Sequence, residues 1–210
     1  MMNKKILLII SASVLGWSFC PASVISLPSW NYSGGVYCYA PVLGIDSGTG
    51  YQSITFDGHQ SSFGAMGVSI VTDSTTDPTM IVNNSLNNTS SFAWTEYIIN
   101  VAMNQSFSID SAGVITPSGW TAVITPPTGP DGSGNYTGII DLKGGTPVAI
   151  SSILDFGYQI TFSGSTSYSL TESANPVPEP GTLGFLMTGG LLVGGWAMAK
   201  RQQASLRVRA

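Results

Sequence analysis

The stretch from Phe92 to Met103 constrains the fold of this chain more than any other part of the sequence. Its residues alternate between two faces with the period of a β-strand. The wholly apolar face carries Tyr97, Ile99, Val101 and Met103. The mixed face carries Phe92, Trp94, Glu96, Ile98, Asn100 and Ala102. This pattern predicts a strand that turns one face to the core and the other to a partly wet surface.

Similar short segments follow one another along the chain, separated by turn signals rich in Gly, Pro, Asn and Ser. None of the segments between the two ends of the chain has a convincing helical period. We therefore expect an all-β ectodomain, an antiparallel β-sandwich of Greek-key or jelly-roll type. The expected strands are 36–39, 52–56, 65–72, 80–82, 92–103, 107–109, 120–125, 136–142, 148–154 and 158–162, with 168–171 as an added edge strand. Residues 57–60, 83–88 and 126–135 are expected as turns or loops.

Both ends of the chain have the composition of targeting segments. Lys4 and Lys5 precede an apolar run from Ile6 to Trp17, which predicts a signal peptide over residues 1–22. If cleavage follows Ala22, Cys38 is the single remaining cysteine. We expect Cys38 to be buried in a strand, with intermolecular pairing as the alternative.

Charge is distributed unevenly along the sequence. Residues 23–175 contain ten acidic residues and one basic residue, Lys143, for a net charge of −9. Such a domain would repel phosphate backbones, so we expect no nucleic acid as a partner. The other six basic residues lie in the two terminal segments.

The C-terminal segment has three parts in a fixed order. It begins with Val177, Pro178, Glu179 and Pro180, continues with 18 uncharged residues from Thr182 to Ala199, and then reaches Lys200 and Arg201. As a helix, the uncharged run would be roughly 27 Å long, which is enough to cross a thin hydrocarbon core. Lys200 and Arg201 would hold that end on the cytoplasmic side.

This tail resembles the PEP-CTERM sorting signal of proteins exported by Gram-negative bacteria. The resemblance implies an exported protein that is anchored in the inner membrane and processed near the motif by exosortase, a membrane-embedded protease of exopolysaccharide-producing bacteria. It implies release to the cell surface or the matrix, with exopolysaccharide as a candidate partner. One departure is Gly181 directly after the second proline, where the family motif often has Ser or Thr. The expected organisation is a signal peptide (1–22), an ectodomain (23–172), a linker with the motif (173–181), a transmembrane helix (182–199) and a basic cytoplasmic tail (200–210).

No catalytic or metal-binding constellation stands out in the ectodomain, and we expect no cofactor. His59 is the single histidine, and we expect an ordinary loop residue there, although Asp57 and Ser61 lie close in sequence. The acidic turns at Asp46 and Asp131 have too few carboxylates for a dedicated calcium loop and are explained by turn chemistry.

Three functions remain open for the ectodomain, and we expect the first. They are a non-catalytic surface or matrix protein, a carbohydrate-binding module and a hydrolase with unmarked acids. A closed core with a buried Trp94 would favour the first, coplanar exposed Trp or Tyr rings the second, and two neighbouring carboxylates in a cleft the third. Trp30, Trp94 and Trp120 are the tryptophans that could form a sugar-stacking platform.

Overall fold

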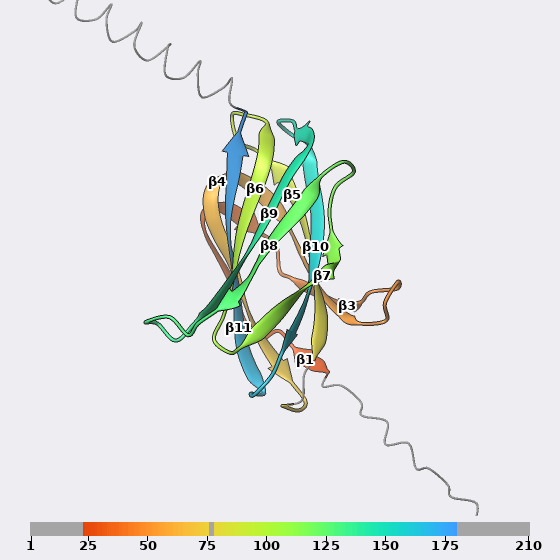
Figure 1. Ribbon diagram of the computed structural model, residues 1–210, viewed down its shortest axis with the longest axis vertical. Helices are drawn as coiled ribbons and strands as arrows, with labels where there is room; N and C mark the ends of the chain where they lie inside the picture. Colours follow the sequence, from red (N-terminus) through yellow and green to blue (C-terminus); the bar gives the residue numbers. More distant parts are fainter. Residues whose placement is uncertain (1–22, 76–77, 180–210) are drawn as a thin grey trace, which may run out of the picture.

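The computed structural model describes residues 23–75 and 78–179, and this part of the chain contains eleven β-strands and no helix (Figure 1). The strands are β1 (Val24–Ser26), β2 (Trp30–Cys38), β3 (Val42–Ile45), β4 (Gln52–Thr72), β5 (Thr79–Asn88), β6 (Trp94–Met103), β7 (Phe107–Ile115), β8 (Thr121–Thr128), β9 (Tyr136–Val148), β10 (Ile153–Phe162) and β11 (Ser167–Pro178). The expected all-β class is therefore confirmed.

The strands form one sheet that curls round until it nearly closes. Its main path runs β7-β10-β5-β4-β11-β6-β9-β8. Outside this path, β1, β2 and β3 each pair with β4. Every pairing is antiparallel except one, because β4 and β5 run parallel from Gln52 beside Met80 to Gln60 beside Asn88. The expectation of a purely antiparallel sheet is wrong at this pair.

Strand β4 folds back on itself, and this explains the parallel pair. A straight strand of its 21 residues would be about 66 Å long. Both of its ends nevertheless contact Val24: Thr72 pairs with Val24, and the side-chain amide of Gln52 donates to the Val24 carbonyl at 2.9 Å. The first half of β4 therefore runs antiparallel to the second half, and the chain enters β5 beside the start of β4.

The fold-back depends on glycines in β2 and β4. Gly34 has φ of +67°, and a Cβ there would lie 2.6 Å from the Phe63 carbonyl oxygen. A Cβ on Gly64, directly opposite, would lie 2.6 Å from the Ser33 carbonyl oxygen. The register between β2 and β4 shifts at this point, so the two strands bend together. Only glycine allows backbones to approach this closely.

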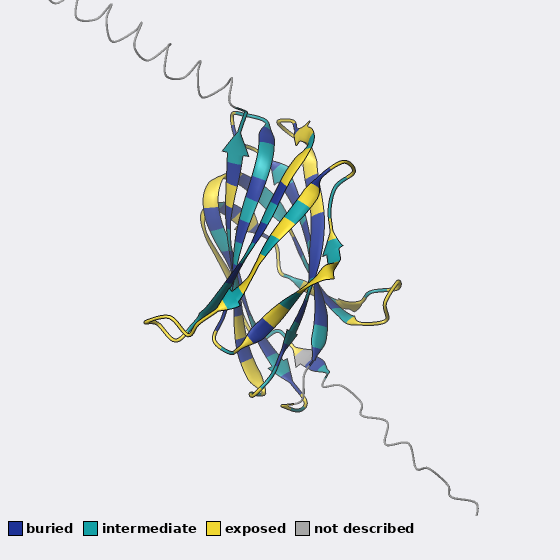
Figure 2. Ribbon diagram, viewed as in Figure 1, coloured by how far each residue is buried: buried dark blue, intermediate teal, exposed yellow. Residues whose placement is uncertain are grey.

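The core lies inside the curled sheet, where dark-blue buried positions alternate with intermediate or exposed ones along β5, β6 and β11 (Figure 2). In β6 the predicted apolar face is buried, with Tyr97, Ile99, Val101 and Met103 fully enclosed. Trp94 was assigned to the other face but is also fully buried, because a register shift between Trp94 and Glu96 reverses its side. Trp120 is buried as well, whereas Trp30 is half exposed.

Three segments expected outside the sheet are strands in whole or in part. The expected loop over residues 126–135 begins inside β8, which continues to Thr128. Residues 83–88, expected as a loop, form the second half of β5, where Asn84 and Asn88 are buried and hydrogen-bonded. Polar residues obscured the strand because their side chains bond inside the protein. Residues 57–60, expected as a turn, lie within β4.

The expected linker over residues 173–181 is also sheet as far as Pro178. β11 pairs with β4 from Ser167 to Ala174 and with β6 from Leu170 to Pro178, so it is a central strand and not an edge strand. Pro176 and Pro178 fall where only β6 still pairs. A strand tolerates proline where one side lacks a partner, since the missing N–H is then not needed.

The two ends of the described domain lie far apart. β1 lies at one end of the long axis, and the tip of β11 lies at the other (Figure 1). No helix within residues 23–75 and 78–179 is long and apolar enough to cross a membrane. The expected signal peptide, the uncharged run of residues 182–199 and the pair Lys200 and Arg201 lie outside the described residues.

The glycine fold-back gives a stability prediction. Gly34→Ala should lower the free energy of unfolding by about 3 kcal/mol, because the new methyl group adds a backbone clash to the cost of a positive φ. Gly50→Ala is the matched control, since Gly50 has φ of +75° but open space around it. It should cost only about 1 kcal/mol. Urea unfolding followed by tryptophan fluorescence measures both, and equal losses would contradict the role assigned to the fold-back.

Candidate functional site

The most distinctive surface feature is a group of neighbouring aromatic rings along β2, which we call the tyrosine strip: the exposed Tyr32 and Tyr37 of β2, the exposed Tyr39 just after it, and the partly buried His59 of β4. Tyr37 is its centre, with ring centroids 5.0 Å from Tyr32 and 5.3 Å from Tyr39. His59, opposite Tyr37 on β4, stacks on it at 4.8 Å and 15°. Trp30 lies two residues before Tyr32 and is 48% exposed.

Strand alternation and the fold-back build the strip. Val36 and Cys38 of β2 point into the core, so Tyr37 and Tyr39 between and after them point outward. The bend at Gly34 brings Tyr32 from the other half of β2 against Tyr37. The sequence predicts only residues 36–39 as a strand here and does not identify the strip, because the bend that joins the two halves of β2 is a long-range feature.

The strip suits a neutral, hydroxyl-rich ligand. In the part of the chain that the structure describes, the hydroxyl groups of Tyr32, Tyr37 and Tyr39 have no hydrogen-bond partner within the protein. Their rings offer apolar faces, and their hydroxyls are free to donate and accept. The rings do not form one flat platform, since Tyr37 is tilted 57° from Tyr32 and 86° from Tyr39. Of the measured ring pairs in the strip, only Tyr37 and His59 are close to parallel.

His59 does not form a catalytic arrangement with its sequence neighbours. Asp57, His59 and Ser61 lie on the same face of β4 at alternate positions. Within the described residues no hydrogen bond joins them, and the Ser61 hydroxyl instead donates to the Gly35 carbonyl oxygen at 3.2 Å. The stacking of His59 on Tyr37 makes it part of an aromatic surface.

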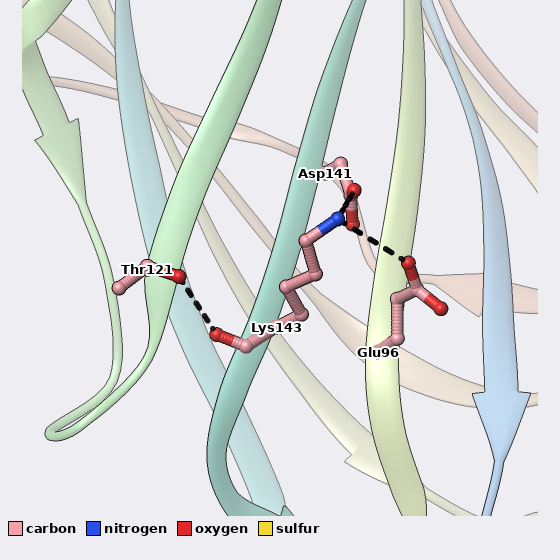
Figure 3. A network of polar contacts seen from close by, with 4 residues as sticks. All are labelled: Glu96, Thr121, Asp141 and Lys143. Atoms are coloured by element: carbon pink, nitrogen blue, oxygen red, sulfur yellow. Dashed lines mark hydrogen bonds and ion pairs between the residues drawn. The ribbon is translucent and has the colours of Figure 1, made fainter.

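A pair of carboxylates lies on the outer face of β6 and β9, where Lys143 joins them (Figure 3). The Lys143 ammonium group binds the Asp141 carboxylate and lies 3.9 Å from Glu96 Oε1. Partial burial, the hydrogen bond with Asp141 and repulsion from Asp141 raise the pKa of Glu96, and Lys143 opposes this. Thr121 on β8 donates to the Lys143 carbonyl oxygen at 3.1 Å.

This cluster lacks the setting that a glycoside hydrolase needs. Glu96 and Asp141 lie on the sheet face opposite the core, and Lys143 occupies the space beside both. A depression of about 230 Å³ lies elsewhere, and its lining contains no carboxylate. Its lining residues are Ser106, Phe107, Ser108, Thr161, Phe162 and Ser163.

The acidic turns use their carboxylates to hold the backbone. Asp46 Oδ2 accepts from the Gly48 and Thr49 N–H groups at 3.1 and 2.8 Å, and from the Thr49 hydroxyl at 2.9 Å. Asp131 Oδ1 accepts from the Ser133 and Asn135 N–H groups at 2.8 and 2.9 Å. Hydrogen bonds from Thr49 and from Asn135, respectively, lower the pKa of the two acids. These contacts are the turn chemistry that the sequence predicts.

The interior holds a polar group that sequence reasoning missed. Glu172 of β11 is fully buried and accepts from the Tyr158 hydroxyl on β10 and from Asn84 Nδ2 on β5 at 3.1 Å. Burial raises the pKa of Glu172 to about 7, while the bonds from Tyr158 and Asn84 lower it. The contact joins strands on opposite sides of β4 in the sheet path.

Cys38 is buried as expected. Burial, followed by repulsion from Glu172 and Asp57, raises its thiol pKa to about 11. A thiol of this kind is a poor nucleophile.

The described part of the expected sorting motif lies at the tip of β11. Val177 and Pro178 pair with Glu96 and Trp94 of β6, and Glu179 follows directly. The Thr95 hydroxyl lies 3.4 Å from the Val177 and Pro178 carbonyl oxygens. Pro180, Lys200 and Arg201 are outside the described residues.

Glu172 gives a prediction for the pH dependence of stability. Its pKa rises from 4.5 in the unfolded chain to about 7 in the fold. As the pH rises, Glu172 therefore loses its proton at a lower pH in the unfolded chain than in the fold. The free energy of unfolding should fall between about pH 4.5 and 7 and level off above pH 7. The loss should total roughly 3 kcal/mol.

Urea unfolding across this pH range measures the effect. Glu172→Gln should remove the fall, because it cannot ionise. Tyr158→Phe should extend the fall to higher pH, since it removes a bond that lowers the pKa of Glu172 in the fold. Identical pH profiles for the wild-type protein and Glu172→Gln would contradict the assignment.

Comparison of the chain with protein-family models, with curated proteins and with solved structures found no match. The functional conclusion therefore depends on the residues of this chain and on their geometry.

Proposed function

We propose that this chain is an exported cell-surface or matrix protein, anchored through its C-terminal segment and processed near Pro178-Glu179-Pro180 by exosortase. The described domain would be its non-catalytic ectodomain, with the curled sheet classed as a sandwich of Greek-key or jelly-roll type. Trp94 is buried in a closed core, which supports a non-catalytic role over a hydrolase.

The observation that carries this proposal is the tail itself, whose motif, uncharged run and basic pair follow one another in the sequence. The fold is compatible with it, since β11 brings Glu179 to the end of the domain away from Val24. In this arrangement the end of the domain next to Glu179 lies beside the membrane, and the end that carries Val24 points away from it.

Cell fractionation in a Gram-negative host with an exosortase tests the proposal. Deleting residues 182–210 should convert a membrane-associated precursor into soluble periplasmic protein, because the apolar run supplies the anchor. Glu179→Ala should leave the anchor intact and cause the unprocessed precursor to accumulate in the membrane. Asp110→Ala, which changes an exposed acid on β7 away from β6 and β11, should be processed normally. Membrane association that survives the deletion would overturn the proposal.

A second candidate function is glycan binding, which the tyrosine strip favours. Three exposed tyrosines with unpaired hydroxyls lie within 5.3 Å of a neighbouring ring, on a domain with one lysine and no arginine. Such a surface fits an uncharged polysaccharide better than an anionic one. A surface protein with this strip would hold the matrix to the cell.

Affinity electrophoresis in gels containing exopolysaccharide tests the strip. Tyr37→Ala should reduce retardation several-fold, because Tyr37 contacts three other rings. Tyr51→Ala is the matched control, since Tyr51 is exposed but lies outside the strip. Equal retardation of wild-type protein and Tyr37→Ala would exclude the strip as the binding site.

A further inference from the structure

The end of the domain at which β11 finishes is composed almost entirely of uncharged residues. We call this surface the exit rim and define it by the following segments: Gly34–Gly35, Ser61–Gly64, Thr89–Phe92, Gly144–Ile153 and Val177–Glu179. Glu179, next to the expected span, is the only charged residue in these segments.

Hydrogen bonds of two buried residues, Asn88 and Gln60, hold the exit rim together. The Asn88 backbone accepts from Ser151 N–H at 2.7 Å and donates to the Ser152 carbonyl oxygen at 2.9 Å, and its side chain donates to the Val148 carbonyl oxygen at 2.9 Å. Gln60 accepts the Thr89 N–H at 2.9 Å on its carbonyl oxygen. These bonds tie the β9–β10 turn, the end of β5 and the fold-back of β4 into one surface.

The rim also exposes three large apolar side chains from two of these segments. Phe63 on the fold-back of β4 is 58% exposed, and Ile150 and Ile153 at the β9–β10 turn are 54% and 60% exposed. Pro147 and Ala149 beside them are exposed as well. Isolated exposed apolar residues are ordinary, but here they coincide with an absence of charge.

Few acids of the domain lie at or beside the rim. Asp73 and Asp131 lie in loops at the opposite end, beside β1 and the start of β9. The acids near the rim are Glu96 and Asp141, which the single lysine of the domain, Lys143, binds, and Asp155, which is exposed on β10 two residues after Ile153. The rim is therefore the end of the domain that an anionic lipid surface repels least.

The length of chain beyond the rim brings it close to a bilayer. Pro178 is still paired in the sheet, and the uncharged run begins four residues later at Thr182. Four extended residues span at most about 14 Å. The headgroup layer alone occupies about 5 to 7 Å on each side of the hydrocarbon core.

We propose that the exit rim docks on the lipid headgroup surface, with Phe63, Ile150 and Ile153 inserted among the headgroups. This inference rests on the proposed function, because it requires residues 182–199 to span the membrane. Aromatic and branched apolar side chains are favoured at this boundary. Docking on one rim would hold the domain upright and present β1 and the acidic loops to the outside.

Fluorescence quenching by brominated phospholipid tests the docking. The full chain is reconstituted in vesicles of zwitterionic and anionic phospholipid, with Cys20→Ser to remove the other thiol. Single probes are placed at Phe63→Cys, Ile150→Cys and, as the distant control, Ser133→Cys. Cys38 does not compete for the probe, since its thiol is buried.

Probes at positions 63 and 150 should be quenched several-fold more than the probe at 133. Ile150→Glu combined with Ile153→Glu should reduce quenching at 63 about two-fold or more, because paired carboxylates would lift the rim from anionic lipid. Val42→Glu combined with Ile45→Glu is the matched control, since both residues are at least as exposed as Ile150 and Ile153 but lie on β3, away from the rim.

Flotation of the vesicles separates the two possible failures. Protein that floats but shows equal quenching at all three positions overturns the docking and leaves the anchor in place. Protein that does not float overturns the anchor, and the docking with it.

Discussion

The fold-back of β4 is the constraint on which the rest of the structure depends. One strand of 21 residues pairs with β5 through its first half and with β11 through its second half, so it belongs to both sides of the curled sheet. Gly34 and Gly64 permit the bend, because any Cβ there would meet backbone oxygen at 2.6 Å. The same bend places Tyr32 against Tyr37 and brings Phe63 to the exit rim. Core closure, the tyrosine strip and the rim therefore share one local cause.

Buried polar groups give the interior its specificity at a cost in stability. Gln60 bonds to Ser62 and to Ala174, and its amide oxygen accepts from the Tyr97 hydroxyl, so the bend is fixed to both β11 and β6. Glu172 joins β11 to β5 and β10, but as a buried acid it is favourable only while protonated. An apolar residue would remove the pH penalty, yet it would leave Tyr158 and Asn84 without this partner. Polar contacts of this kind favour one pairing of the strands over alternative pairings.

The sequence predicts local features well and long-range ones poorly. The alternation from Tyr97 to Met103 correctly predicts a half-buried strand because it depends only on period. The Asn-rich end of β5 and the proline-containing end of β11 were expected as loop and linker, because their composition is unfavourable for strands. They form strands since the side-chain N–H groups of Asn84 and Asn88 donate buried hydrogen bonds, and since only β6 pairs beside Pro176 and Pro178. The parallel pair and the tyrosine strip require the bend in β4, which no local pattern encodes.

The proposed anchoring and the proposed glycan binding make compatible demands on the domain. The exit rim closes one end of the long axis, and the tyrosine strip begins beside it, since Gly34 and Gly35 of the rim lie between Tyr32 and Tyr37. From Tyr37 the strip continues to Tyr39, away from the bend and toward β3. A domain held on the membrane by its rim would therefore leave Tyr37 and Tyr39 open to the surrounding matrix. The acids at the far end keep that end soluble and repel anionic lipid. Charge placement and strand geometry thus favour the same orientation, in which the long axis of the domain points away from the membrane.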